Sequence, residues 1–293
     1  MRGVRQRGRR VLQRLVFPPD ASGNSMKWCG KGDGLTGKRY AGACVFTPWA
    51  ALAMMPGTVM ANAADGQDGA AVTAPEVPPD EVQLIAHAAI LSDYRFRGLS
   101  YSHGRPVVQT SLVVAHDSGV YGGVFASSLG NHDIYGAVEI DVFAGWAGAI
   151  APAVMADVSL FYYYYPDGEP AFPHTDSFET ALQLTGEFGA FKPKIGAWYS
   201  WEQAAIGGRD NLYLFGDLVW RVPGTPLEAK VHGGYTDGAY SIAADRTSVD
   251  WSVGLAFRAA NNIRLGVEYV GMGGPKVKDY TDDTVAASLS VEF

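Results

Sequence analysis

Charged side chains at every second position of one short stretch are the first residues in this chain that suggest chemistry. Asp93, Arg95 and Arg97 alternate with Tyr94 and Phe96. Residues two apart in a strand share a face, so the three charges would lie side by side. On the inner wall of a barrel they would form a charged constriction that selects solutes. The alternative is a set of structural ion pairs with carboxylates across the barrel.

Other charged residues recur with the same period in later segments. Most of them are acidic, which predicts a lumen that favours cations or neutral polar solutes over anions. The alternative is that the arginines determine the charge at the narrowest point of the lumen. The residues expected to line the lumen are Asp93, Arg95, Arg97, Glu139, Asp141, Glu179, Glu187, Glu202, Asp217, Arg258, Arg264 and Glu268.

Histidine, serine and acidic residues also occur near one another, which is the residue set of a serine hydrolase. Most lie in predicted turns or loops, and neither G-x-S-x-G nor H-E-x-x-H occurs. The six histidines have no metal-ligand spacing. We therefore predict no enzyme, no catalytic residues, no cofactor and no metal site. The hydrolase candidates that remain are His116 with Asp117 and Ser118, His132 with Asp133, and His174 with Asp176.

The segments that hold these residues alternate between apolar and polar side chains. About twelve such segments follow one another from Val82, each roughly ten residues long, which is the length of a tilted transmembrane strand. The first is predicted over Val82–Gly98 and the last over Asp283–Phe293. Because alternation with a period of two indicates strands with one apolar face, the chain is predicted to be all-β.

The connections between these segments distinguish a membrane barrel from a soluble sandwich. Short turns alternate with longer loops, and aromatic residues gather near segment ends, as in Tyr162–Tyr165. Outer-membrane barrels have both features. A sheet can cross hydrocarbon only if it closes on itself, because every backbone N–H and C=O must be paired. We predict a closed antiparallel up-and-down barrel of about twelve strands.

Composition and charge agree with this class. Charged residues make up 18% of the chain, against about 25% in a typical soluble domain. Ten of the 23 Lys and Arg lie in residues 1–63 with two of the 30 Asp and Glu, which leaves 13 basic and 28 acidic residues beyond, a net of −15. Nucleic acid is therefore not expected as a partner. Both cysteines, Cys29 and Cys44, precede the predicted barrel.

The N-terminal part has the layout of an export signal. A basic stretch is followed by a mainly apolar one and by Ala61-Asn62-Ala63, an A-x-A cleavage site. We predict a possible upstream extension over 1–25 with Met26 as the alternative start, a signal peptide over 26–63, a flexible periplasmic lead-in over 64–81 and the barrel over 82–293. The predicted location is the outer membrane of a Gram-negative cell.

Several motifs resemble one known family. Ser92–Ser100, Gln109, Tyr121–Gly123, Glu139–Asp141 and Phe161–Pro166 are similar in type and spacing to the proteobacterial TorF-type porins, formerly a conserved hypothetical outer-membrane family. The likeness covers roughly residues 82–293. It implies an outer-membrane location and a pore role, and it assigns no binding residues.

The sequence thus predicts an outer-membrane channel for small polar solutes. The alternatives are a structural or adhesive barrel without an open pore and, less favoured, an outer-membrane hydrolase. The expected partners are outer-membrane lipid, lipopolysaccharide, small solutes and the barrel-assembly machinery, which would recognise the last strand ending at Phe293.

Overall fold

The computed structural model describes residues 82–169 and 174–293. The predicted upstream extension, signal peptide and lead-in lie outside these residues. Among the described residues, no helix has both the length and the apolar character needed to cross a membrane.

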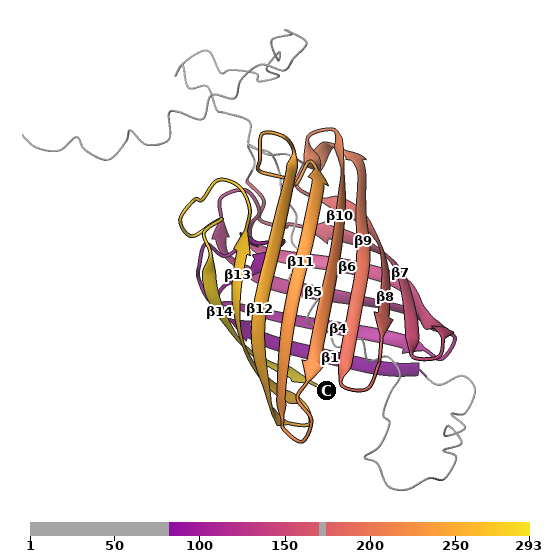
Figure 1. The fold of residues 1–293 in the computed structure, drawn as a ribbon. Helices are drawn as coiled ribbons and strands as arrows, with labels where there is room; N and C mark the ends of the chain where they lie inside the picture. The colour runs from indigo at the N-terminus through magenta and orange to yellow at the C-terminus, as the bar shows by residue number, and fades with distance from the viewer. Residues whose placement is uncertain (1–81, 170–173) are drawn as a thin grey trace, which may run out of the picture. The chain divides into compact units, whose positions relative to one another are not determined.

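Twelve antiparallel strands form a closed barrel (Figure 1). Each strand pairs with its neighbours in the chain, and β1 also pairs with β14, so no edge strand remains. The up-and-down barrel predicted from the sequence is therefore confirmed. The barrel strands are β1 (Val82–Leu91), β4 (Val107–His116), β5 (Val120–His132), β6 (Gly136–Ala151), β7 (Val154–Tyr164), β8 (Ser177–Gly186), β9 (Phe191–Gln203), β10 (Arg209–Arg221), β11 (Leu227–Gly238), β12 (Thr247–Ala260), β13 (Ile263–Met272) and β14 (Thr284–Glu292).

The two ends of the barrel differ in their connections. At one end, here called the turn end, strands are joined by residues 117–119, 152–153, 187–190, 222–226 and 261–262. Val82 and Phe293 lie at this end as well, since Ala86 and Phe293 exchange backbone hydrogen bonds. At the other, the loop end, the connections are residues 92–106, 133–135, 165–176, 204–208, 239–246 and 273–283. The expected rhythm holds except at two connections: 133–135 is shorter than predicted because β5 extends to His132, and 204–208 is no longer than the turn 222–226.

The outer face of the barrel is apolar. Leu84, Leu182, Val253, Leu255 and Val285 are each more than half exposed to the surroundings of the barrel. A soluble protein rarely exposes a continuous surface of this kind, whereas a barrel in lipid requires it.

Exposed aromatic side chains border this apolar surface at both ends. Near the loop end they are Tyr164, Phe178, Tyr199, Trp201, Tyr235, Trp251 and Tyr269. Near the turn end they are Trp146, Phe188, Phe191, Trp220, Phe257 and Phe293. Two aromatic belts separated by an aliphatic band are the pattern that the two faces of a bilayer impose on a barrel.

Candidate functional site

The first connection at the loop end folds into a small hairpin. Strand β1 ends at Leu91 instead of continuing to Gly98 as predicted. A short ladder then forms between β2 (Arg95–Phe96) and β3 (Leu99–Ser100). The two residues between them, Arg97 and Gly98, have φ values of 47° and 82°. Positive φ at both central positions defines a tight I′-type turn, in which glycine is favoured. Residues 92–105 are called the inner hairpin below.

The inner hairpin crosses the lumen. It leaves the barrel wall between β1 and β4, yet Arg97 at its tip contacts Glu179 of β8 and Tyr213 of β10. Those strands are not neighbours of β1 or β4 in the barrel order, so the contact spans the interior. A Cβ built on Gly98 would lie 2.6 Å from the Cβ of Met272, so only glycine fits against β13 at this tip.

Arg97 is held by a buried ion pair and by aromatic rings. Its Nη2 donates to both carboxylate oxygens of Glu179, at 2.9 and 3.0 Å. Both side chains are almost fully buried, at 3% and 0% exposure. The guanidinium also lies 4.2 Å from the ring centre of Tyr213 and 5.4 Å from that of Tyr240. A cation buried this way needs its carboxylate partner, because leaving either charge unpaired is costly.

Arg95 stabilises the hairpin itself. Its Nε donates to Asp93 Oδ2 at 2.5 Å, and its Nη1 donates to the carbonyls of Gly98 at 3.1 Å and Asp282 at 2.8 Å. Asp93 Oδ1 in turn accepts from the hydroxyl of Ser100. Asp93, Arg95 and Arg97 are thus brought together inside the barrel, on a hairpin and not on a strand face. Their role in lining a pore stays a prediction.

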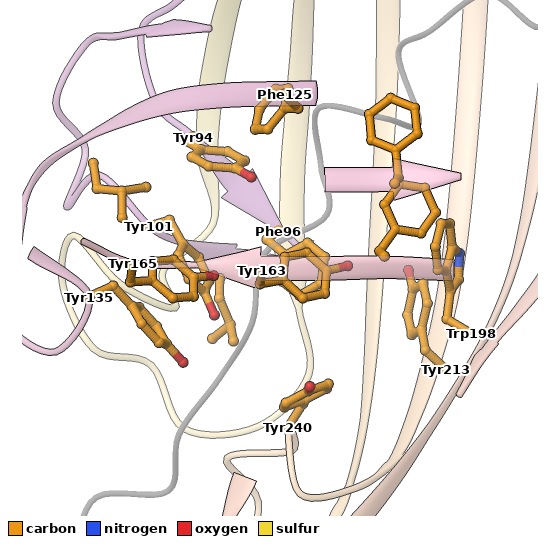
Figure 2. Packing of buried hydrophobic residues seen from close by; sticks show 14 of the residues in the cluster. Tyr94, Phe96, Tyr101, Phe125, Tyr135, Tyr163, Tyr165, Trp198, Tyr213 and Tyr240 are labelled. Atoms are coloured by element: carbon orange, nitrogen blue, oxygen red, sulfur yellow. The ribbon is translucent and has the colours of Figure 1, made fainter. Parts of the chain in front are cut away.

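Aromatic side chains fill the space around the hairpin (Figure 2). Tyr101 stacks on Tyr135 at 5.5 Å between ring centres, and Tyr135 lies 4.4 Å from Tyr165. Burial raises the pKa values of Tyr101 and Tyr165 well above their usual range, so both phenols stay neutral. This cluster ties the hairpin to the neighbouring loops at the loop end.

Two buried carboxylates lie beside this cluster on β6. Glu139 is fully buried and Asp141 is 5% exposed. Glu139 Oε1 accepts a hydrogen bond from the hydroxyl of Tyr165 at 3.2 Å. The alternative considered above, an ion pair with a carboxylate across the barrel, does form, but Arg97 makes it with Glu179 and not with these two carboxylates.

A polar network occupies the middle of the lumen. The ring of His232 is clamped between two carboxylates, with Nδ1 2.9 Å from Asp217 Oδ1 and Nε2 2.9 Å from Asp250 Oδ1. Lys230 Nζ lies 3.8 Å from Asp217 Oδ1 and 3.6 Å from Glu268 Oε1. Lys230 and His232 thus each bridge two of the three carboxylates in this network.

Arginines gather at the turn end of the lumen. Arg258 and Arg264 both contact Glu228, at 2.8 and 2.7 Å. Glu187 pairs with Lys192 at 3.2 Å in the turn between β8 and β9. Glu202 lies near the loop end, where it is exposed. The predicted set of lumen residues therefore divides into three groups along the barrel instead of one constriction.

Several charged and polar groups in the lumen are missing from the predicted set. They are Tyr163, Asp157, Lys194, Tyr213, Glu228, Lys230, His232, Tyr240 and Asp250. The strand period signals most of them, since they alternate with outward apolar residues. Tyr240 carries no such signal because it lies in a loop.

The histidines of the hydrolase candidates lie at strand ends or in a loop, His116 at the end of β4, His132 at the end of β5 and His174 between β7 and β8. His116 Nδ1 lies 2.9 Å from Ser118 Oγ and also accepts from the backbone N–H of Ser118, so it closes a turn. His132 lies 5.4 Å from Tyr101, ring centre to ring centre, within the aromatic cluster. Within residues 82–169 and 174–293, no group of three His, Cys, Asp or Glu side chains could hold a metal ion.

With this geometry described, the chain can be compared with known proteins. Residues 76–292 match the family described as "Bacterial protein of unknown function (Gcw_chp)". The chain belongs to the Gcw_chp family. In this member, the matched region contains the whole barrel and the inner hairpin. No protein of curated function matches the sequence.

Solved structures with a similar fold are outer-membrane barrels of low sequence identity to this Gcw_chp chain. The NanC porin is 11% identical, with 72% of this chain and 99% of that chain covered and a TM-score of 0.49. The KdgM porin in complex with disordered oligogalacturonate is 7% identical, with 72% and 98% covered and a TM-score of 0.48. Outer membrane phospholipase A from Escherichia coli is 11% identical, with 71% and 89% covered and a TM-score of 0.41.

Proposed function

We propose that this Gcw_chp protein is an outer-membrane channel for small polar solutes, narrowed at its loop end by the inner hairpin. The observation that carries the proposal is the contrast between the two faces of one closed barrel. The outer face is apolar and bordered by two aromatic belts, while the inner face holds ion pairs. A twelve-strand barrel is wider than one that side chains alone can fill, and charged side chains on its inner wall favour the passage of hydrated polar solutes.

The resemblance to TorF-type porins supports the same proposal. One of its two more specific motifs, Ser92–Ser100, lies in the inner hairpin. In a channel, this segment would set the narrowest point at the loop end. Outer-membrane lipid and lipopolysaccharide would surround the apolar band, and the assembly machinery would bind the strand that ends at Phe293.

A barrel without an open pore is the second candidate, and one observation favours it. The tip of the inner hairpin reaches the opposite wall and is held there by the ion pair between Arg97 and Glu179. Such a barrel would have a structural or adhesive role.

Conductance in planar lipid bilayers separates the two candidates. We expect the purified full barrel to give discrete current steps that are small for twelve strands, because the hairpin occupies part of the cross-section. Barrel folding is checked first by heat-modifiable gel mobility. A correctly folded protein that gives no steps over a range of voltages would favour the closed barrel.

We also propose export through a cleavable signal peptide over residues 26–63. The intact mass of the protein isolated from outer membranes should correspond to a chain that begins at Ala64, after the A-x-A site. A mass that includes residues 26–63 would contradict cleavage.

A further inference from the structure

Three arginines share one carboxylate at the turn end of the lumen. Arg258 Nη2 lies 2.8 Å from Glu228 Oε1, and Arg264 Nη2 lies 2.7 Å from Glu228 Oε2. Arg221 Nε lies 4.0 Å from the same carboxylate. Arg221 and Glu228 are cross-strand partners on β10 and β11, and Arg258 and Arg264 are partners on β12 and β13. All four therefore belong to one wall of the barrel.

This group carries excess positive charge. Lys192 and Glu187 adjoin it, because Glu187 Oε1 lies 3.2 Å from Lys192 Nζ and 3.6 Å from Arg221 Nη2. Together the group holds four cations and two carboxylates, an excess of two positive charges. Glu292 on neighbouring β14 would reduce the excess to one. Lys230, further into the lumen, is balanced by its own carboxylates.

The arginines keep donors that the protein does not use. Three guanidiniums offer about fifteen N–H groups, whereas the two carboxylates of Glu228 and Glu187 together offer roughly eight acceptor sites. The side chains of Arg221, Arg258 and Arg264 are 43%, 52% and 34% exposed, so water in the lumen reaches them. Arg258 and Arg264 also face each other directly across the ladder, and the carboxylate of Glu228 is the one anion between these two like charges.

We propose that this cluster, Arg221, Arg258 and Arg264 around Glu228, binds an oxyanion, the carboxylate or phosphate group of a small solute. The planar fork of arginine matches the paired oxygens of such groups. As a solute preference, the inference rests on the proposed channel function. As a binding site, it stands without transport and is measured without it.

Binding of inorganic phosphate to the detergent-solubilised full barrel tests the site. We expect Arg264→Gln to weaken phosphate binding about tenfold in calorimetry at low ionic strength, the loss of one charge-assisted contact. Arg258→Gln, at the most exposed of the three positions, should weaken it in the same direction. Lys278→Gln is the matched control, because it removes one positive charge from the loop end, where the side chain is 87% exposed.

Glu228→Gln should change the phosphate affinity in the direction opposite to the arginine variants. It removes the carboxylate that competes for the three arginines, so phosphate should bind more tightly. Undetectable phosphate binding by the native barrel, or weaker binding by Glu228→Gln in a folded barrel, would overturn the inference.

Bilayer recordings distinguish this inference from the proposed function. With a salt gradient, we expect the native reversal potential to indicate a preference for anions, and Arg264→Gln to shift it toward cations. Current steps with no anion preference and no phosphate binding would rule out the oxyanion site and still support the proposed channel function. Phosphate binding without current steps would reject the channel and leave the site.

Discussion

In the proposed channel, Arg97→Ala should open the loop end of the barrel and raise the single-channel conductance. The substitution leaves Glu179 buried at 0% exposure with its cation removed. Breaking one partner of a buried ion pair costs about 3–5 kcal/mol, which is enough to release the tip of the hairpin from β8 while the aromatic cluster still holds its base. Steps should become larger in bilayers, and a protease should cut residues 92–105 faster than in the native protein.

Two comparisons show whether the ion pair is responsible. A double variant, Arg97→Met with Glu179→Leu, leaves no uncompensated charge, so it should recover part of the stability that either single change loses. Lys278→Ala breaks an exposed pair with Asp279 at the same end of the barrel, and such pairs contribute little. Equal conductance in the native and Arg97→Ala barrels would show that the Arg97–Glu179 ion pair does not hold the hairpin across the lumen.

Leu255→Arg should hinder assembly of the barrel in lipid. Leu255 is 58% exposed on the outer face of β12 and lies opposite Val267 of β13, which is 47% exposed. An arginine on the lipid face near the midplane costs about 2–4 kcal/mol. Folding into vesicles, followed by heat-modifiable gel mobility, should show a smaller folded fraction, and Val267→Arg should behave in the same way.

The matched control places the same charge on the other face. Ala286 of β14 points into the lumen opposite Glu268, so Ala286→Arg gains a solvated position near a carboxylate. It should assemble nearly as well as the native chain. If both faces tolerated arginine equally, the assignment of the outer face to lipid would be wrong.

The barrel was predictable because its signals are local. Alternation places Trp251, Val253 and Leu255 outward and Ser252 inward, and the structure agrees. Closure follows from the need to pair every backbone group in lipid. These arguments use only the period along one strand and the length of each connection.

The inner hairpin could not be predicted from the same signals. Asp93, Arg95 and Arg97 alternate as they would on a long strand, and only the turn at Gly98 reveals that the chain reverses. Which carboxylate Arg97 reaches depends on the width and shear of the closed barrel, and no local pattern encodes these. The same holds for the three arginines that share Glu228, where charge counting indicated an acidic lumen.

The seam between β1 and β14 has a consequence for how the barrel is made. Five residue pairs, from His87 with Glu292 to Leu91 with Ser288, join the first strand to the last. The contact of Ala287 N–H with Ser92 Oγ spans 195 residues of chain. Contacts this distant form slowly, so the ring closes only after the entire chain is present. Until then β1 and β14 each have one edge with unpaired backbone N–H and C=O groups. A chaperone or folding catalyst must shield these edges from pairing with a second copy.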